Sequence, residues 1–192
     1  MAKRTILLAS ASPRRRDLLR QHGYAVKIAP SRVDEVVPDF LTVAETTLLN
    51  AKLKAQEVAH AHPDALVLAA DTLVAFEGRI FGKPRDLDEA FDMLSRLSGQ
   101  AHEVFSGVWL AHRSSGRWLA FTEVSRVHFR KMSAPEIREY ISRVNPLDKA
   151  GAYAAQQNEM DLIESIQGSY TNVVGLPMER LAQALRRFDA MN

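Results

Sequence analysis

Apolar and polar residues alternate along the chain in blocks that predict alternating strands and helices. Residues 5–9 and 25–29 are short apolar runs, each predicted to form a strand. Between them, Ser12 and Pro13 predict the start of a helix, because serine favours the N-cap and proline the first helical position. Residues 65–76 are almost entirely apolar, which is typical of a central strand buried on both faces.

Capping patterns predict three further helices. Thr42 and Glu45 have the spacing of a capping box, and the amphipathic helix that they open is predicted to end near Ala61. Asp86 and Ser133 are each followed three residues later by glutamate, so each is predicted to cap another helix.

The second half of the chain predicts a hairpin, a turn-rich stretch and a last helix. Residues 103–111 and 118–130 are predicted to be long strands joined by the Ser-Ser-Gly turn at 114–116. The segment 145–175 is rich in turn residues, and 178–188 is predicted to be a helix. The fold class predicted is therefore α/β, with a mixed, twisted sheet and flanking helices.

Composition narrows the class of protein. With 192 residues, 46% hydrophobic and 25% charged, the chain is predicted to be a single globular domain over 1–192. The absence of cysteine excludes disulfides and thiolate metal sites, and a net charge of +2 does not indicate nucleic-acid binding. No apolar run reaches 18 residues and the N-terminal apolar stretch is too short for a signal peptide, so a cytoplasmic protein without a membrane segment is expected.

The first predicted helix begins with an unusual cluster of hydroxyl and cationic side chains. Its residues are Ser10, Ser12, Arg14, Arg15 and Arg16. Cations are unfavourable at a helix N-terminus, whereas a phosphate there meets unpaired N–H groups and the positive end of the helix dipole. A solvated basic first turn is the alternative, but the cluster favours an anion site.

Asp71 is the clearest catalytic candidate. It interrupts the apolar run 65–76, which continues beyond it with Leu73 and Val74. A buried carboxylate costs several kcal/mol unless it has a partner, so an acid in a central strand indicates a metal ion, a cation or a catalytic role.

Three loops are candidate ligand-binding segments only when they are considered together with other residues. Asp34 and Glu35 alone are typical of a charged loop, but with Asp71 they could complete an oxygen-ligand site for Mg²⁺. The segment 82–85 (Gly-Lys-Pro-Arg) alone is typical of an exposed loop, and Lys83 supplies a charge. The glycine-rich loops within 148–177 suit a planar ligand, although tight structural turns have a similar composition.

Seven segments together resemble the Maf family of nucleotide pyrophosphatases, also described as septum-formation-inhibitor proteins. They occur in family order and span nearly the whole chain. The matching segments are LASASPRRRDLL, VDE, AKLKA, AADTLVAFEGRIFGKPRD, LSGQAHEVFSGV, PLDKAGAYAAQ and IQGSYTNVVGLP.

The resemblance implies two lobes around a cleft, as in inosine triphosphate pyrophosphatases, and release of pyrophosphate from a nucleoside triphosphate with Mg²⁺ or Mn²⁺. It implies that Asp71 is the proton acceptor and that Glu35 and Asp71 are the metal-side acids. The residues that it implies as phosphate contacts are Ser12, Arg15, Lys54 and Lys83. The residues that it associates with base selection are Arg14, Thr72 and Gln156.

The segment DKAGAY followed by Gln156 resembles the branch of the family that acts on dTTP and UTP. The alternatives are the branch acting on 7-methyl-GTP, which carries cysteine in place of Lys149, and a nucleotide-binding regulator of septum formation with little catalysis. The chain departs from the family pattern at Gln157, where glycine is usual, and at Asn145, where an acid often precedes the proline. Neither nucleic acid nor membrane is expected as a partner, and a homodimer is left open.

Overall fold

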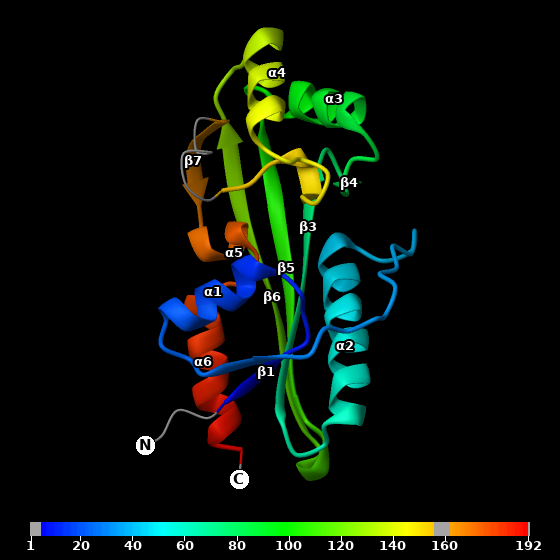
Figure 1. Cartoon of the computed structure of the whole chain (residues 1–192), viewed down its shortest axis with the longest axis vertical. Helices are drawn as coiled ribbons and strands as arrows, with labels where there is room; N and C mark the ends of the chain where they lie inside the picture. Colours follow the sequence, from blue (N-terminus) through cyan, green and yellow to red (C-terminus); the bar gives the residue numbers. More distant parts are fainter. Residues whose placement is uncertain (1–4, 156–161, 192) are drawn as a thin grey trace. The chain divides into compact units, whose positions relative to one another are not determined.

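A computed structural model describes residues 5–155 and 162–191 (Figure 1). Within these residues, seven strands form one mixed sheet in the order β2-β1-β3-β5-β6-β7, with β4 paired to β3. The strands are β1 (Ile6–Leu8), β2 (Val26–Ile28), β3 (Leu66–Phe76), β4 (Arg79–Phe81), β5 (Ala101–His112), β6 (Arg117–Phe129) and β7 (Ile163–Gln167). The helices are α1 (Pro13–Gln21), α2 (Val43–Ala61), α3 (Leu87–Leu97), α4 (Ala134–Arg143), α5 (Tyr170–Val174) and α6 (Met178–Asp189), with 3-10 turns η1 (Arg113–Ser115) and η2 (Ala150–Ala152).

The α/β class and the mixed sheet are confirmed, and the predicted central strand is β3. All but two of its residues are buried, and β1 and β5 are its neighbours on either side in the sheet order. β1 pairs in parallel with both β2 and β3, whereas β4 and β7 run antiparallel to their partners. Three elements, β4, β7 and α5, were not predicted from the sequence.

β4 was not predicted because its turn carries an unusual residue. The pairing of Phe76 with Arg79 leaves Glu77 and Gly78 as a two-residue hairpin loop. Both have positive φ, 50° and 74°, as a type I′ turn requires. Asparagine or aspartate normally precedes glycine in such turns, so Glu-Gly gives a weak hairpin signal.

The chain divides into two compact units, in agreement with the two lobes expected. Unit 1 comprises Met1–Thr72, Ser106–Glu123 and Gly175–Asn192, and unit 2 comprises Leu73–Phe105 and Val124–Val174. Because β3, β5 and β6 contribute residues to both units, the division falls within strands rather than at a linker.

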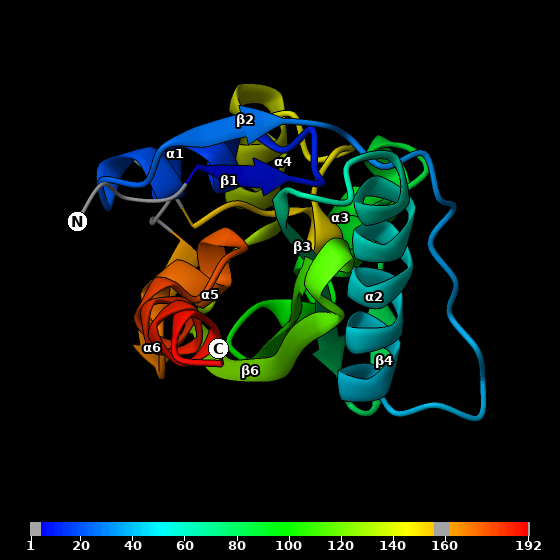
Figure 2. The same ribbon diagram turned by 90° about the horizontal axis from the view of Figure 1, so that it is seen from below.

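In unit 1, α2 packs against strands β1 and β3. Ala55 and Val58 of α2 form one apolar cluster with Leu7 of β1 and Val67 of β3. Both ribbon views place β3 and β6 between α2 and α6 (Figure 2). The small side chains on α2 allow the helix to lie close to the sheet.

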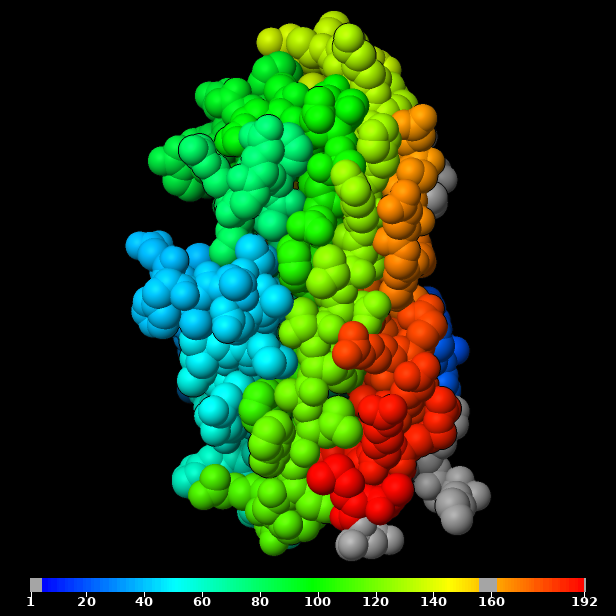
Figure 3. Space-filling model, turned by 180° about the vertical axis from the view of Figure 1, so that it is seen from behind, coloured from blue at the N-terminus to red at the C-terminus, as the bar shows by residue number. Residues whose placement is uncertain are grey.

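α6 lies beside the part of β6 that belongs to unit 1 (Figure 3). One face of this amphipathic helix is buried, including Leu181 and Phe188. On its other side, Arg180 donates hydrogen bonds to the carbonyl of Thr122 (2.7 Å) and to the carboxylate of Glu123 (2.9 Å). Among the described residues, no helix combines the length and the apolar character needed to cross a membrane.

Unit 2 has its own apolar core beneath α3 and α4. Leu94 and Leu97 of α3 pack with Ile137 of α4, Phe129 of β6 and Tyr153. The side chain of Asp86 caps α3 as the sequence predicts, accepting a hydrogen bond of 2.8 Å from the backbone N–H of Glu89.

Candidate active site

The candidate site in unit 1 is built on α2, whose start is set by local sequence. Thr42 and Glu45 form the predicted capping box: the N–H of Glu45 donates to Thr42 Oγ1 (3.3 Å), and the N–H of Thr42 donates to Glu45 Oε2 (2.9 Å). The helix runs to Ala61, as expected. From this start, positions 50 and 54 lie one turn apart on the same face of the helix.

Gly107 on β5 brings α2 close to the sheet. A Cβ atom built at this glycine would lie 2.4 Å from the carbonyl carbon of Thr47 and 2.5 Å from the amide nitrogen of Leu48. Both atoms are α2 backbone, which cannot yield as a flexible side chain can. Glycine at position 107 is therefore required for the distance between α2 and the strands.

Asp71 lies on β3 with 2% of its surface exposed, and cationic and amide groups of α2 satisfy its carboxylate. Lys54 Nζ donates to Asp71 Oδ1 at 2.7 Å, and Asn50 Nδ2 donates to Asp71 Oδ2 at 3.2 Å. Lys54 Nζ also donates to Glu35 Oε1 at 2.6 Å. The structure therefore brings together three residues that the sequence predicts as site residues: Glu35, Lys54 and Asp71.

The environment shifts the ionisation of Asp71. Burial raises the pKa of this carboxyl group above its ordinary value, and the negative charge of Glu35 raises it further. Lys54 and Arg15 oppose the rise by favouring the charged form. A carboxylate with a raised pKa is a stronger base than an exposed aspartate, which is the property that a general base needs.

Arg15 connects α1 to β3 and to Gly175, in the short segment before α6. Its Nε donates to the carbonyl oxygen of Gly175 (2.9 Å), and its two terminal nitrogens donate to Ser10 Oγ (3.2 Å) and Thr72 Oγ1 (3.0 Å). Thr72 Oγ1 in turn shares a hydrogen bond of 2.9 Å with Ser106 Oγ. Burial lowers the pKa of Arg15, while the charges of Asp71 and Glu35 raise it.

The remaining predicted residues of α1 lie at its first turn. Ser12 is the N-cap, and its side chain makes no capping hydrogen bond. Arg14 and Arg15 follow Pro13, and both are half-buried. Arg16 instead forms an ion pair with its neighbour Asp17 (2.8 Å). The arginine cluster is therefore divided, with Arg16 paired locally and Arg15 bound to the interior of unit 1.

In unit 2, two of the predicted loops meet. The backbone N–H of Gly151 in the DKAGAY segment donates to the carbonyl of Gly82 at 3.0 Å. Gly151 has φ of +68°, and a Cβ there would lie 3.2 Å from the side chain of Val74, so glycine suits both the conformation and the space. Lys83 follows Gly82 and is exposed on the loop before α3.

Two positions discussed for base selection, Gln156 and Gln157, lie outside the described residues. Asn145 lies in the loop after α4, where its side chain accepts a hydrogen bond from the N–H of Leu147 (3.2 Å). Asp34 is exposed on the same loop as Glu35.

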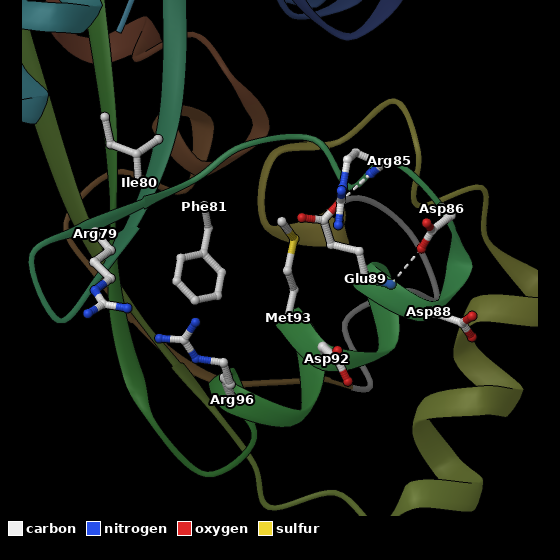
Figure 4. Close-up of a pocket in the computed structure, with 10 residues that line it drawn as sticks. All are labelled: Arg79, Ile80, Phe81, Arg85, Asp86, Asp88, Glu89, Asp92, Met93 and Arg96. Atoms are coloured by element: carbon white, nitrogen blue, oxygen red, sulfur yellow. Dashed lines mark hydrogen bonds and ion pairs between the residues drawn. The ribbon is translucent and has the colours of Figure 1, made fainter. Parts of the chain in front are cut away.

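A separate hollow of about 440 Å³ lies in unit 2 over β4 and α3 (Figure 4). Arg96 stacks on the ring of Phe81 with its guanidinium carbon 4.8 Å from the ring centre, and Arg85 pairs with Glu89 at 2.9 Å. Of the predicted site residues that the structure describes, none lines this hollow.

Sequence reasoning missed Asn50 and Ser106, which both contact predicted site residues. Asn50 is 1% exposed and binds Asp71, and Ser106 is fully buried and binds Thr72. A signal existed for Asn50, because a polar residue at spacing four from Lys54 on an apolar helix face is unusual. Ser106 lies on β5, and its pairing with Thr72 depends on strand contacts that the sequence does not specify.

The whole chain is similar to known proteins. A family model described as "Maf-like protein" matches residues 5–188. A protein of Pelotomaculum thermopropionicum named dTTP/UTP pyrophosphatase is 46% identical, with 95% of this chain and 96% of that protein covered. A protein of Halalkalibacterium halodurans with the same name is 43% identical, with 94% of both covered.

Among solved structures, the Ham1 protein of Staphylococcus aureus superposes with a TM-score of 0.52 at 17% identity, covering 96% of this chain and 99% of that one. At this level of identity, the likeness concerns the fold alone. It agrees with the predicted α/β class.

Proposed function

Because the chain belongs to the Maf family, we propose that it hydrolyses dTTP and UTP to the nucleoside monophosphate and pyrophosphate. The names of relatives that are 43% and 46% identical over nearly the full chain support this reaction and these substrates. The observation that carries the proposal is the buried carboxylate of Asp71, which Lys54 links to Glu35. We also propose that residues 1–192 act as one domain in the cytoplasm.

In the proposed reaction, Asp71 accepts a proton from the water that attacks the α-phosphorus. The raised pKa of its carboxyl group supports this role, since proton transfer is most effective when the pKa of the base approaches the working pH. Asn50 and Lys54 hold one carboxylate oxygen each, so the plane of the carboxylate is restrained relative to that water.

Glu35 and Asp71 fit a divalent cation. A single ammonium group, Lys54 Nζ, contacts both carboxylates, so the two acids lie close enough to share a cation. The described residues contain no group of three or more histidine, aspartate or glutamate side chains suited to a metal ion. Mg²⁺ requires only one or two carboxylates when substrate phosphates and waters supply the other ligands. When bound, Mg²⁺ or Mn²⁺ would neutralise charge on the phosphate oxygens.

We propose that Lys54, Arg15, Ser12 and Lys83 contact the phosphates. The ammonium of Lys54 has three N–H donors and gives two to carboxylates, which leaves one for a phosphate oxygen. Among contacts between described residues, Arg15 uses three of its five donors. Positive groups at these positions would stabilise the charge that develops on the leaving pyrophosphate.

We propose that Arg14, Thr72 and Gln156 select the base. The resemblance of DKAGAY-x-x-Gln156 to the dTTP/UTP branch supports this assignment, as do the names of the relatives.

Pyrophosphate release from a panel of nucleoside triphosphates tests the proposed function. The panel is dTTP, UTP, CTP, GTP, ATP and 7-methyl-GTP, each assayed with Mg²⁺, with Mn²⁺ and with EDTA. We expect turnover of dTTP and UTP at least tenfold above the others, with a monophosphate product and loss of activity in EDTA. Preference for 7-methyl-GTP would assign the chain to the other branch. Nucleotide binding without pyrophosphate release would indicate a regulator and contradict the proposal.

A further inference from the structure

Asn50 is a buried polar residue to which the family resemblance assigns no role, and its contacts extend beyond the one with Asp71. It lies on α2 one turn before Lys54, with 1% of its surface exposed. Asparagine is a poorer helix former than leucine, and a buried amide gains nothing over an apolar side chain unless its hydrogen bonds are made. A residue that breaks the local pattern in this way indicates a functional requirement.

The side-chain amide of Asn50 makes three hydrogen bonds, and they join two segments. Its Oδ1 accepts from the backbone N–H of Val36 at 2.9 Å, and its Nδ2 donates to the carbonyl of Val36 at 3.0 Å. The other N–H of Nδ2 points to Asp71 Oδ2 at 3.2 Å. The two hydrogen bonds with Val36 fix the orientation of the Asn50 amide, because the oxygen must face the N–H and the nitrogen must face the carbonyl. In this orientation the second N–H of Nδ2 faces Asp71.

This contact matters because Val36 follows Glu35 on a long loop. Residues 29–42 connect β2 to α2 without regular secondary structure. Glu57 holds the first part of this loop through the backbone N–H of Arg32 (2.9 Å). Asn50 holds the loop directly beside Glu35, whose own side chain is 47% exposed and reaches Lys54. Two residues of α2 therefore determine the position of the Glu35 carboxylate. Asn50 holds the backbone next to Glu35, and Lys54 binds the side chain of Glu35.

We propose that Asn50 is a positioning residue that holds Glu35 and Asp71 in the arrangement that a divalent cation requires. The amide of Asn50 holds the backbone of Val36, which is next to Glu35, and it also binds one carboxylate oxygen of Asp71. A single side chain therefore links the positions of the two acids. The inference rests on the proposed function only in taking these acids as the metal-side pair. Groups that orient metal ligands typically change metal affinity or activity by about 10–100-fold when they are removed.

Asn50→Leu tests this role, because leucine is similar in size and removes all three hydrogen bonds. The matched control is Thr46→Val, one turn earlier on the same helix, where Thr46 is also fully buried and its hydroxyl has no hydrogen-bond partner among the described residues. Thermal unfolding of both variants identifies any loss of folding. Should Asn50→Leu fail to fold, Asn50→Ser is measured in its place, since it also removes the contact with Asp71.

Binding of Mn²⁺ is measured by electron paramagnetic resonance with α,β-imido-dUTP, a nucleotide that cannot be cleaved. We expect Asn50→Leu to bind Mn²⁺ at least tenfold more weakly than the wild-type protein, and Thr46→Val to bind it within twofold. In turnover of dTTP, we expect kcat of Asn50→Leu to fall at least tenfold while KM for the nucleotide changes less than threefold. Wild-type Mn²⁺ affinity in Asn50→Leu, or absence of Mn²⁺ binding to the wild-type protein, would overturn the inference.

A double variant separates positioning from a general loss of packing. If Asn50 acts by holding Glu35, Asn50→Leu should weaken Mn²⁺ binding by less than threefold in a Glu35→Gln background. A full tenfold loss in that background would contradict the proposed coupling. The metal measurement needs no turnover, so it is independent of the panel assay. A wild-type protein that binds Mn²⁺ but releases no pyrophosphate refutes the proposed function and leaves the test of Asn50 intact.

Discussion

At the scale of single residues, Asp71 and Lys54 form a buried ion pair of 2.7 Å on facing surfaces of β3 and α2. Desolvation of such a pair offsets much of its attraction, so the pair is weak grounds for stability. Removal of the lysine alone would leave a buried charge, which typically costs about 3–5 kcal/mol. The presence of Asp71 in a largely apolar strand is therefore better explained by a chemical role than by a contribution to stability.

Asp71→Asn is expected to fold and to lose nearly all turnover. Asparagine keeps the size of the side chain, and Lys54 keeps its contact with Glu35 at 2.6 Å, so no cation is left without a partner. Loss of a general base typically lowers the rate by about 10²–10⁴-fold. Pyrophosphate release from dTTP measures the effect, and Asp39→Asn, a change at an exposed loop position, is the control. Activity of Asp71→Asn within tenfold of wild type would refute the assignment of the base.

At the scale of elements, α2 is the scaffold of the candidate site. Its capping box fixes where the helix begins, its small residues pack against β1 and β3, and its face toward the strands carries Asn50 and Lys54. Gly107 of β5 allows this close approach. The two side chains that bind Asp71 are therefore placed by a helix, whereas Glu35 is supplied by a loop.

Gly107→Ala is expected to destabilise the protein, because the added methyl group would overlap the backbone of α2 at 2.4–2.5 Å. Overpacking of this kind typically costs about 1–3 kcal/mol, or more where backbone must move. Gly82→Ala is the control, since nothing lies within 4 Å of the corresponding position there. Urea unfolding compares the two variants. Equal stability of both would show that α2 can shift freely, contrary to the role assigned to Gly107.

At the scale of the whole molecule, we expect buried His102 to make the free energy of unfolding depend on pH. His102 lies in the core of unit 2 with 2% of its surface exposed, and its Nε2 contacts the hydroxyl of Tyr153 at 2.8 Å. Burial lowers the pKa of this imidazole to about 4, and the nearby His128 lowers it in the same direction. The folded protein therefore holds His102 neutral at pH values where an unfolded chain would protonate it.

The sign of the effect follows from linkage. An unfolded histidine has a pKa of about 6.5, so below that pH the unfolded state binds more protons and gains stability. The contribution of neutral His102 to the free energy of unfolding is therefore fully present above pH 6.5, and it is lost as the pH falls from 6.5 toward 4. Between pH 7 and pH 5 the free energy of unfolding is expected to fall by about 2 kcal/mol from this residue.

Urea unfolding of His102→Gln at pH 7 and pH 5 measures this contribution. Glutamine retains a polar group for Tyr153 but does not titrate, so the decrease between the two pH values should be about 2 kcal/mol smaller than in the wild-type protein. His60→Gln, at an exposed position on α2, should leave the decrease unchanged. An identical decrease in His102→Gln and wild type would exclude His102 as its source.

The sequence alone determined the features that depend on neighbours along the chain. The capping residues Thr42 and Asp86, the apolar run of β3 and the helical periodicity of α2 all predicted elements that the structure contains, because local propensity and burial pattern act over a few residues. The acid at position 71 could be identified because a charge in an apolar strand conflicts with its local context.

Tertiary structure alone decided which groups meet. The link from Glu35 through Lys54 to Asp71, the hold of Asn50 on Val36, and the contact of Arg15 with Gly175 join residues that are 14 to 160 positions apart. Such contacts depend on how closely α2 and α1 pack on the sheet, which no local pattern specifies. β4 belongs to the same class, since its hairpin forms around a Glu-Gly turn with weak local preference and is stabilised by the core of unit 2.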